Sequence, residues 1–135
     1  MELTRELAKE VVSISETISE ARGVLIREIF EKLAGKWSLW VLYVLAVAGE
    51  PIRFKDIFER VNGISYKVLD QTLKGLERDG LIIKRAFKKQ VPPRTEYELS
   101  PLGRGLLQAS TPLWKWIVST APQFEQARVE LGEKL

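Results

Sequence analysis

The alternation of apolar and polar positions is clearest between residues 63 and 80. Apolar side chains recur there at spacings of three and four, which is the period of a helix buried on one side: Ile64, Val68, Leu69, Leu73 and Leu76. The opposite face carries Ser65, Tyr66, Lys67, Asp70, Gln71 and Lys74. Asp79 and Gly80 then supply a left-handed stop for the helix. The pattern predicts an amphipathic helix whose open face can make hydrogen bonds.

The residues that follow this helix are typical of a β-hairpin. Residues 81–87 are rich in β-branched and apolar side chains, and residues 95–99 alternate between outward and inward positions. A shorter helix is predicted before the first one, over residues 54–61, with Asn62 and Gly63 as the turn between the two helices. This order predicts a winged helix-turn-helix, a mainly α fold with a small β-hairpin.

The N-terminal third is predicted to be helical. Apolar residues step by three and four from Leu3 to Leu25, which indicates a long amphipathic helix with a break at Arg22 and Gly23. A second helix is expected over residues 24–34. Residues 36–48 are apolar almost all round, as in a central buried helix, and residues 52–54 form either an edge strand or the approach to a helix.

The C-terminal part begins with a strong helix-start signal, Ser100 followed by Pro101. Pro112 is expected to interrupt this helix or to start a new segment, after which an apolar stripe continues almost to the end of the chain. Exposed stripes of this length are rare on monomers, so the two ends are predicted to form a dimer interface. Its predicted residues are Leu3, Leu7, Val11, Ile14, Ile18, Leu113, Trp116, Ile117 and Phe124.

These elements predict one winged-helix domain with an extension at each end. The N-terminal dimerisation helix would take residues 1–23, the DNA-binding domain residues 24–104, and the C-terminal dimerisation helices residues 105–135. At 135 residues the chain has room for a single sizeable core.

The composition excludes several kinds of site. The chain has no cysteine and no histidine, so it lacks disulfides, thiolate metal sites, cysteine nucleophiles and the commonest general base. Its acidic residues come without a glycine-rich phosphate loop or metal-ligand spacing, so neither catalysis nor a cofactor is predicted. The longest apolar run, near residues 39–48, is shorter than the roughly 20 residues of a membrane span, which favours a soluble cytoplasmic protein.

Charge is distributed unevenly along the chain. The net charge is +3, but residues 51–104 hold twelve Lys and Arg against seven Asp and Glu, a local balance of +5. Such a basic centre is typical of a protein that faces a polyanion, although a solvated basic surface would have the same composition. Together with the predicted winged helix-turn-helix, this charge makes double-stranded DNA the predicted partner.

The open face of the second helix holds the candidates for reading bases. Gln71 can bond adenine with two hydrogen bonds, Lys67 can donate to guanine acceptors, and Tyr66 can meet a thymine methyl group or a phosphate. The candidates for phosphate and wing contacts are Arg53, Lys55, Ser65, Lys74, Lys88, Lys89 and Arg94. Two of these have a structural alternative. Ser65 can serve as an N-cap, and Arg94 can brace the hairpin against Glu96 or Glu98.

Six motifs in register resemble the HxlR family of winged-helix transcription regulators, which have an architecture like that of the MarR regulators. They cover residues 33–38 (LAGKWS), 52–57 (IRFKDI), 63–65 (GIS), 73–82 (LKGLERDGLI), 91–99 (VPPRTEYEL) and 100–103 (SPLG). The resemblance spans about residues 24–116. It implies a homodimeric repressor or activator that binds a pseudo-palindromic operator, with residues 65–76 as recognition helix and residues 88–94 as wing.

One departure from that family affects the expected signal. Family members that sense oxidants have in common a cysteine thirteen residues before the tryptophan of the Gly-Lys-Trp motif. In this sequence, which resembles theirs, Val24 stands at that position. Thiol switching is therefore excluded, and any small-molecule effector is unknown.

Two alternatives stay open at the level of sequence. A winged helix can serve protein or RNA contact without specific DNA readout, although Tyr66 is the one fair candidate for stacking on RNA bases. The four tryptophans, Trp37, Trp40, Trp114 and Trp116, could line an apolar pocket between the dimer arms, or could simply pack in the core.

Overall fold

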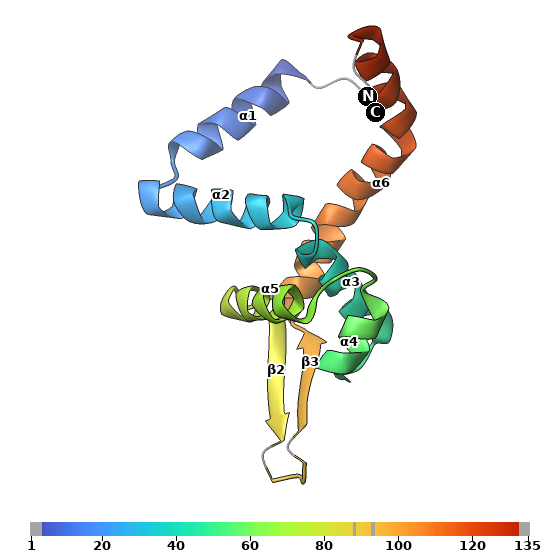
Figure 1. The fold of residues 1–135 in the computed structure, drawn as a ribbon. Coiled ribbons are helices and arrows are strands. Elements are labelled where there is room, and N and C mark those ends of the chain that lie inside the picture. The colour runs from blue at the N-terminus through green and yellow to red at the C-terminus, as the bar shows by residue number, and fades with distance from the viewer. Residues whose placement is uncertain (1–3, 88, 93, 133–135) are drawn as a thin grey trace. The chain divides into compact units, whose positions relative to one another are not determined.

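The computed structural model describes residues 4–87, 89–92 and 94–132, and Figure 1 shows the chain as a ribbon. The chain divides into two compact units, Met1–Lys36 and Trp37–Leu135. In chain order the elements are α1 (Arg5–Glu16), α2 (Glu20–Ala34), α3 (Ser38–Ala48), β1 (Ile52–Arg53), α4 (Phe54–Arg60), α5 (Tyr66–Arg78), β2 (Ile82–Phe87), β3 (Arg94–Leu99) and α6 (Pro101–Glu130).

The first unit consists of two separately capped helices. The N–H of Leu7 donates to the Thr4 hydroxyl at the start of α1 (3.1 Å), and the N–H of Arg22 donates to the Ser19 hydroxyl at the start of α2 (3.2 Å). The break predicted at Arg22 and Gly23 is wrong, because α2 passes through Gly23 and the chain turns at residues 17–19 instead. A capping serine sets the helix start, whereas a glycine inside an exposed helix costs only about 1 kcal/mol.

The core of the second unit lies where α3 meets the sheet, α4, α5 and the start of α6. The side chains with almost no exposure are Val41, Leu42, Ile57, Val61, Leu69, Leu73 and Leu76. Trp37 packs against this cluster, whereas Trp40 and Val47 on the opposite side of α3 are exposed. The prediction that α3 is buried all round is therefore wrong, because its neighbours cover one face of it.

The sheet is antiparallel, with the strand order β1-β3-β2. The short strand β1 pairs Ile52 with Tyr97 at one edge, which settles the open choice for this segment in favour of an edge strand. Strand β2 forms the other edge, and its register pairs Ile82 with Leu99 and Phe87 with Arg94. Between these ends, residues 83–86 of β2 are exposed.

The predicted start of α6 is confirmed. The buried Ser100 hydroxyl accepts from the Gly103 N–H (3.0 Å) and donates to the carbonyl of Gly80 (2.6 Å), which ties α6 to the end of α5. A Cβ at position 103 would lie 2.2 Å from the Leu81 carbonyl oxygen, so only glycine permits this close crossing. Gly80 itself has φ +75°, in agreement with the predicted left-handed stop.

Helix α6 runs without interruption through Pro112 and Pro122, so the predicted break at Pro112 is wrong. Each proline removes one backbone hydrogen bond. Thr111 and Thr120, close before the two prolines, make additional bonds within the helix by donating to the carbonyls of Leu107 and Trp116 (2.6 and 2.7 Å). The domain boundaries predicted at 23/24 and 104/105 fall inside α2 and α6.

Candidate nucleic-acid interface

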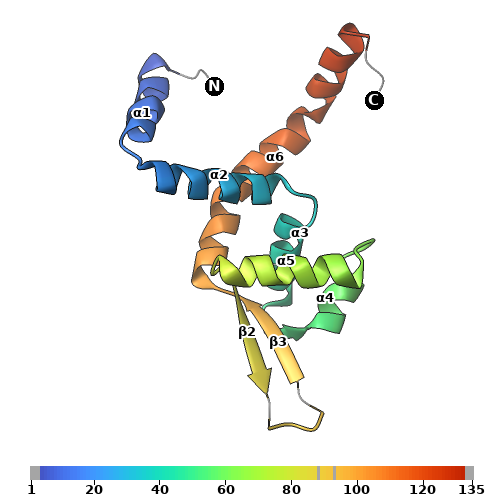
Figure 2. The same cartoon turned by 60° about the vertical axis from the view of Figure 1, so that its left-hand side comes forward.

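Helices α4 and α5 form a helix-turn-helix. The turn contains Gly63 at φ +88°, and the N–H of Val68 donates to the Ser65 hydroxyl (3.1 Å) at the start of α5. The interpretation of Ser65 as N-cap is therefore confirmed. Figure 2 shows α5 side-on, with α4 beside it and the hairpin of β2 and β3 extending away from the domain.

The two faces of α5 differ sharply in exposure. Leu69, Leu73 and Leu76 are buried, whereas Lys67, Gln71 and Lys74 are exposed at spacings of four and three. One of these cations has a partner on its own helix, because Lys74 Nζ lies 2.9 Å from the Asp70 carboxylate. Since that pair is solvent-exposed, its contribution to stability is small, and a phosphate can replace the carboxylate.

Tyr66 lies against α4 rather than standing free. Its ring stacks on Phe58 with centroids 4.0 Å apart and planes 6° apart, and on Phe54 at 5.6 Å and 11°. The residue is nevertheless 59% exposed, so it can still meet a ligand. Sequence reasoning missed this contact, because it joins two helices and leaves no local spacing signal.

The start of α4 places Arg53 and Lys55 at the surface. The backbone N–H of Arg53 donates to the Asp56 carboxylate (3.4 Å), which puts a negative charge in the first turn of α4. The Asp56 carboxylate therefore already occupies the N-terminus of α4. Any phosphate contact here depends on the side chains of Arg53 and Lys55.

The hairpin is braced by ion pairs along its two strands. Arg85 Nε donates to Glu98 (2.8 Å) across the two strands. Arg94 Nε lies 3.7 Å from Glu96, and its guanidinium carbon lies 5.5 Å from the centre of the Phe87 ring. Arg94 therefore has the bracing position considered above, with Glu96 as partner. Lys89 is exposed, and Lys88 lies outside the described residues.

Tyr97 is a buried residue of β3 and does not face solvent. Burial raises the pKa of its hydroxyl, and the carboxylates of Asp70 and Glu77 on α5 raise it further. The residue stays neutral near pH 7, so its contribution is to packing.

Most of the described residues that were predicted for the dimer interface lie on exposed surface. Leu7, Val11 and Ile14 are exposed on α1, and Leu113, Trp116, Ile117 and Phe124 are exposed on α6. On α6 the rings of Trp116 and Phe124 meet edge to face at 5.9 Å. Ile18 is half-buried in the turn between α1 and α2, and Leu3 lies outside the described residues.

Two kinds of site are not found in the described part of the chain. Residues 4–87, 89–92 and 94–132 contain no group of three or more acidic side chains placed to hold a metal ion. None of the helices described combines the length and apolar content that crossing a membrane requires.

Comparisons with known proteins agree with this geometry. A model of the family described as HxlR-like helix-turn-helix matches residues 32–125. An uncharacterised HTH-type transcriptional regulator, YtfH of Escherichia coli K12, is 32% identical over 123 residues, covering 88% of this chain and 95% of its own. Another, from Halalkalibacterium halodurans, is 42% identical over 84 residues, which cover 62% of this chain and 73% of the relative.

A solved structure extends the agreement to the fold. A protein from Enterococcus faecalis V583, described as a MarR-family transcriptional regulator, is similar with a TM-score of 0.64 at 28% identity, over 82% of this chain and 96% of its own. The family match includes the helix-turn-helix, the hairpin and most of α6. The chain belongs to the HxlR-like helix-turn-helix family of transcriptional regulators.

Proposed function

We propose that the protein regulates transcription by binding double-stranded DNA in a sequence-specific manner, with α5 in the major groove. The observation that carries this proposal is the division of α5 into a buried apolar face and an exposed face of Lys67, Gln71 and Lys74. A helix in the major groove needs one face held by its own domain and the other free to reach base edges. The assignment to a family of transcriptional regulators supports the same role and favours no catalytic one.

We assign the residues of the interface by their positions. Gln71 and Lys67 face outward on successive turns of α5 and would contact base edges. Lys74, Arg53 and Lys55 would contact phosphates beside them, and Lys88 and Lys89 would let the wing grip the backbone or enter the minor groove. The Tyr66 side chain, whose ring is held in place by Phe58, would meet a thymine methyl group or a phosphate. Ser65 and Arg94 have mainly structural roles in this assignment.

The proposal includes a homodimer. The apolar stripes of α1 and α6 are exposed, and exposed apolar stripes of such length mark interfaces. A second copy of the chain would cover them, and a two-fold dimer would present two copies of α5 to a pseudo-palindromic operator.

Selection of bound duplexes from random-sequence DNA tests the proposal, with the mass of the protein measured in the same buffer near physiological salt. The expected result is a two-fold-related motif with half-sites about one helical turn apart and a protein mass of twice 15.4 kDa. Recovery of no motif, with weak binding that vanishes as salt rises, would contradict specific DNA reading and favour a winged helix used for protein or RNA contact.

A further inference from the structure

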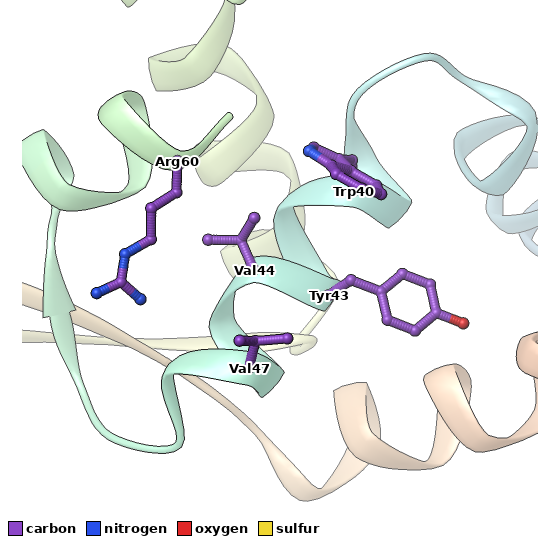
Figure 3. A pocket seen from close by; sticks show the side chains of 5 residues that line it. All are labelled: Trp40, Tyr43, Val44, Val47 and Arg60. Carbon is purple, nitrogen blue, oxygen red and sulfur yellow. The ribbon is translucent and has the colours of Figure 1, made fainter. Parts of the chain in front are cut away.

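Helix α4 contributes to two clusters that contain aromatic residues. The first is an apolar pocket of about 170 Å³, lined by Trp40, Tyr43, Val44, Val47 and Arg60. Figure 3 shows the guanidinium group of Arg60 directed away from Trp40 and Tyr43, so this charge does not face the aromatic walls. Of the four tryptophans considered for a pocket from the sequence, Trp40 alone lines this one, and the pocket lies within one domain rather than between dimer arms.

The second cluster is the aromatic stack, formed by Phe54 and Phe58 of α4 with Tyr66 of α5. Phe54 and Phe58 are four residues apart, so they lie on one side of α4. The rings of Phe58 and Tyr66 are nearly parallel with their centroids 4.0 Å apart, which means that Phe58 covers one face of the Tyr66 ring. Both phenylalanines are half-buried and pack against the core, whereas Tyr66 is 59% exposed. The aromatic stack therefore connects a ring at the protein surface to the fixed interior of the domain.

The position of Tyr66 in α5 indicates what its ring can meet. Tyr66 is the first residue of α5, directly after the N-cap Ser65. In a helix-turn-helix the N-terminal residues of the second helix contact base edges. The charges that attract a phosphate near this end of the helix-turn-helix belong to Arg53 and Lys55, and Tyr66 offers an exposed apolar ring instead. In the major groove such a ring can contact the C5 methyl group of thymine.

We propose that Tyr66 determines specificity for a pyrimidine with a C5 methyl group, thymine or 5-methylcytosine, and that Phe58 positions its ring. This role rests on the proposed function, and it selects the methyl group over a phosphate as the contact of Tyr66. Ordering a freely rotating side chain on binding costs entropy, which would offset the small gain from one methyl group. Parallel packing on Phe58 orders the Tyr66 ring before DNA binds, so the gain is kept.

The methyl group can be removed from DNA without another change, because uracil differs from thymine only in lacking it. The duplex selected from random-sequence DNA is prepared with one thymine position at a time, in both half-sites, replaced by uracil. Fluorescence anisotropy gives the thymine preference, which is the ratio of the two affinities. We expect about fourfold for each half-site at one position of the motif. If that position is changed to a C·G pair, methylation of the cytosine at C5 should raise the affinity by the same factor.

Variants of the full chain separate the ring from its support. Tyr66→Ala should reduce the thymine preference to about one, whereas Tyr66→Phe should keep it because the ring remains. Phe58→Leu keeps an apolar side chain but removes the flat surface, and should lower the preference to less than about twofold. Phe58→Tyr keeps the ring and should retain the preference. A loss of stability alone would not change this ratio, and thermal unfolding confirms that each variant is folded.

The matched control is Trp40→Leu, which removes an aromatic ring from an exposed position on α3 outside the aromatic stack and should leave the thymine preference unchanged. Failure of the proposed function and failure of this inference give different results. Absence of any selected motif would overturn both. A motif in which uracil replaces every thymine without loss would overturn the inference alone. A preference that disappears in Tyr66→Phe would assign the contact to the hydroxyl group, and one that is unchanged in Phe58→Leu would remove the positioning role of Phe58.

Discussion

Helices α5 and α6 are both amphipathic, but their apolar stripes have different surroundings. In α5 the chain itself covers the apolar stripe, because Leu69, Leu73 and Leu76 are buried in the core. In α6 only Gly103 and Leu107 are buried among the described residues, and Leu113 and Trp116 remain more than half exposed. An amphipathic pattern therefore predicts which face of a helix is apolar, but not whether the same chain covers that face.

The difference bears on what each helix offers to a ligand. With its apolar face satisfied, α5 presents polar side chains at fixed positions, as base reading requires. With its apolar face open, α6 presents the surface that a second copy would cover in the proposed dimer. The predictions below treat the polar face of α5 and the apolar face of α6 as separate properties, each of which a single substitution can remove.

Trp116→Asp should have the largest effect. A charge in the exposed stripe of α6 would prevent burial of that stripe, so the protein should sediment at 15.4 kDa rather than at twice that mass. Its affinity for the selected operator should fall at least about 100-fold, because two linked reading helices become one. Lys115→Asp places the same charge at the neighbouring exposed position, about 100° around the helix, and should change neither quantity. A dimer that survives Trp116→Asp would contradict the placement of the interface.

Leu73→Ala should destabilise the domain itself. Leu73 is 2% exposed, and removing its side chain should lower the free energy of unfolding by about 3 kcal/mol through a cavity in the core. Urea denaturation checks this value. Gln71→Ala, two residues away on the exposed face, serves as control and should leave the free energy of unfolding nearly unchanged.

Lys88→Ala with Lys89→Ala should weaken binding to every duplex alike, on the order of tenfold near physiological salt. The slope of log affinity against log salt should fall by about one unit for each lost phosphate contact. Fluorescence anisotropy over a salt series measures both effects. Lys9→Ala with Lys115→Ala removes equal charge outside the hairpin, and an equal loss there would mean that overall charge, not the wing, holds the DNA.

Gln71→Ala should change preference rather than general affinity. Loss of a two-bond contact to adenine should reduce the preference for the selected duplex over random DNA by about fivefold to tenfold, while random DNA is bound as before. Competition between the two duplexes gives this ratio directly. If both affinities fell together, Gln71 would belong with the phosphate contacts.

Tyr66→Ala should have the smallest effect on the helix-turn-helix. Loss of stacking on Phe58 and Phe54 should cost about 1 kcal/mol of unfolding free energy, whereas Tyr66→Phe keeps the stack and should be neutral. A loss of DNA affinity in Tyr66→Phe at unchanged stability would show that the hydroxyl contacts DNA.

Most of the fold could be predicted from local signals. The Ser65 cap, the stop at Gly80, and Ser100 with Pro101 each determine an element boundary through contacts a few residues apart. The predictions at Gly23 and Pro112 were wrong for a common reason. Both disfavour a helix by a limited amount, and neighbouring hydrogen bonds of the same helices, such as that of Thr111, outweigh the cost.

The candidate site was predictable only as a list of exposed positions. Periodicity placed Lys67 and Gln71 on the open face of α5, and the structure agrees. The stack of Tyr66 on Phe58 and the pairing of Arg85 with Glu98 each depend on contacts between elements. Such contacts follow from how helices and strands pack, which residue spacing along one element does not encode.

Strand β2 forms an edge of the sheet, and the cations on this strand affect how that edge can pair with other chains. An edge strand with the sequence Ile82-Ile83 and Ala86-Phe87 would be a template for strand addition by other chains, and hence for aggregation. Lys84 and Arg85 interrupt the apolar run at its centre and act as gatekeepers. Neutralising them would therefore lower the solubility of the protein at high concentration, whatever it did to DNA binding.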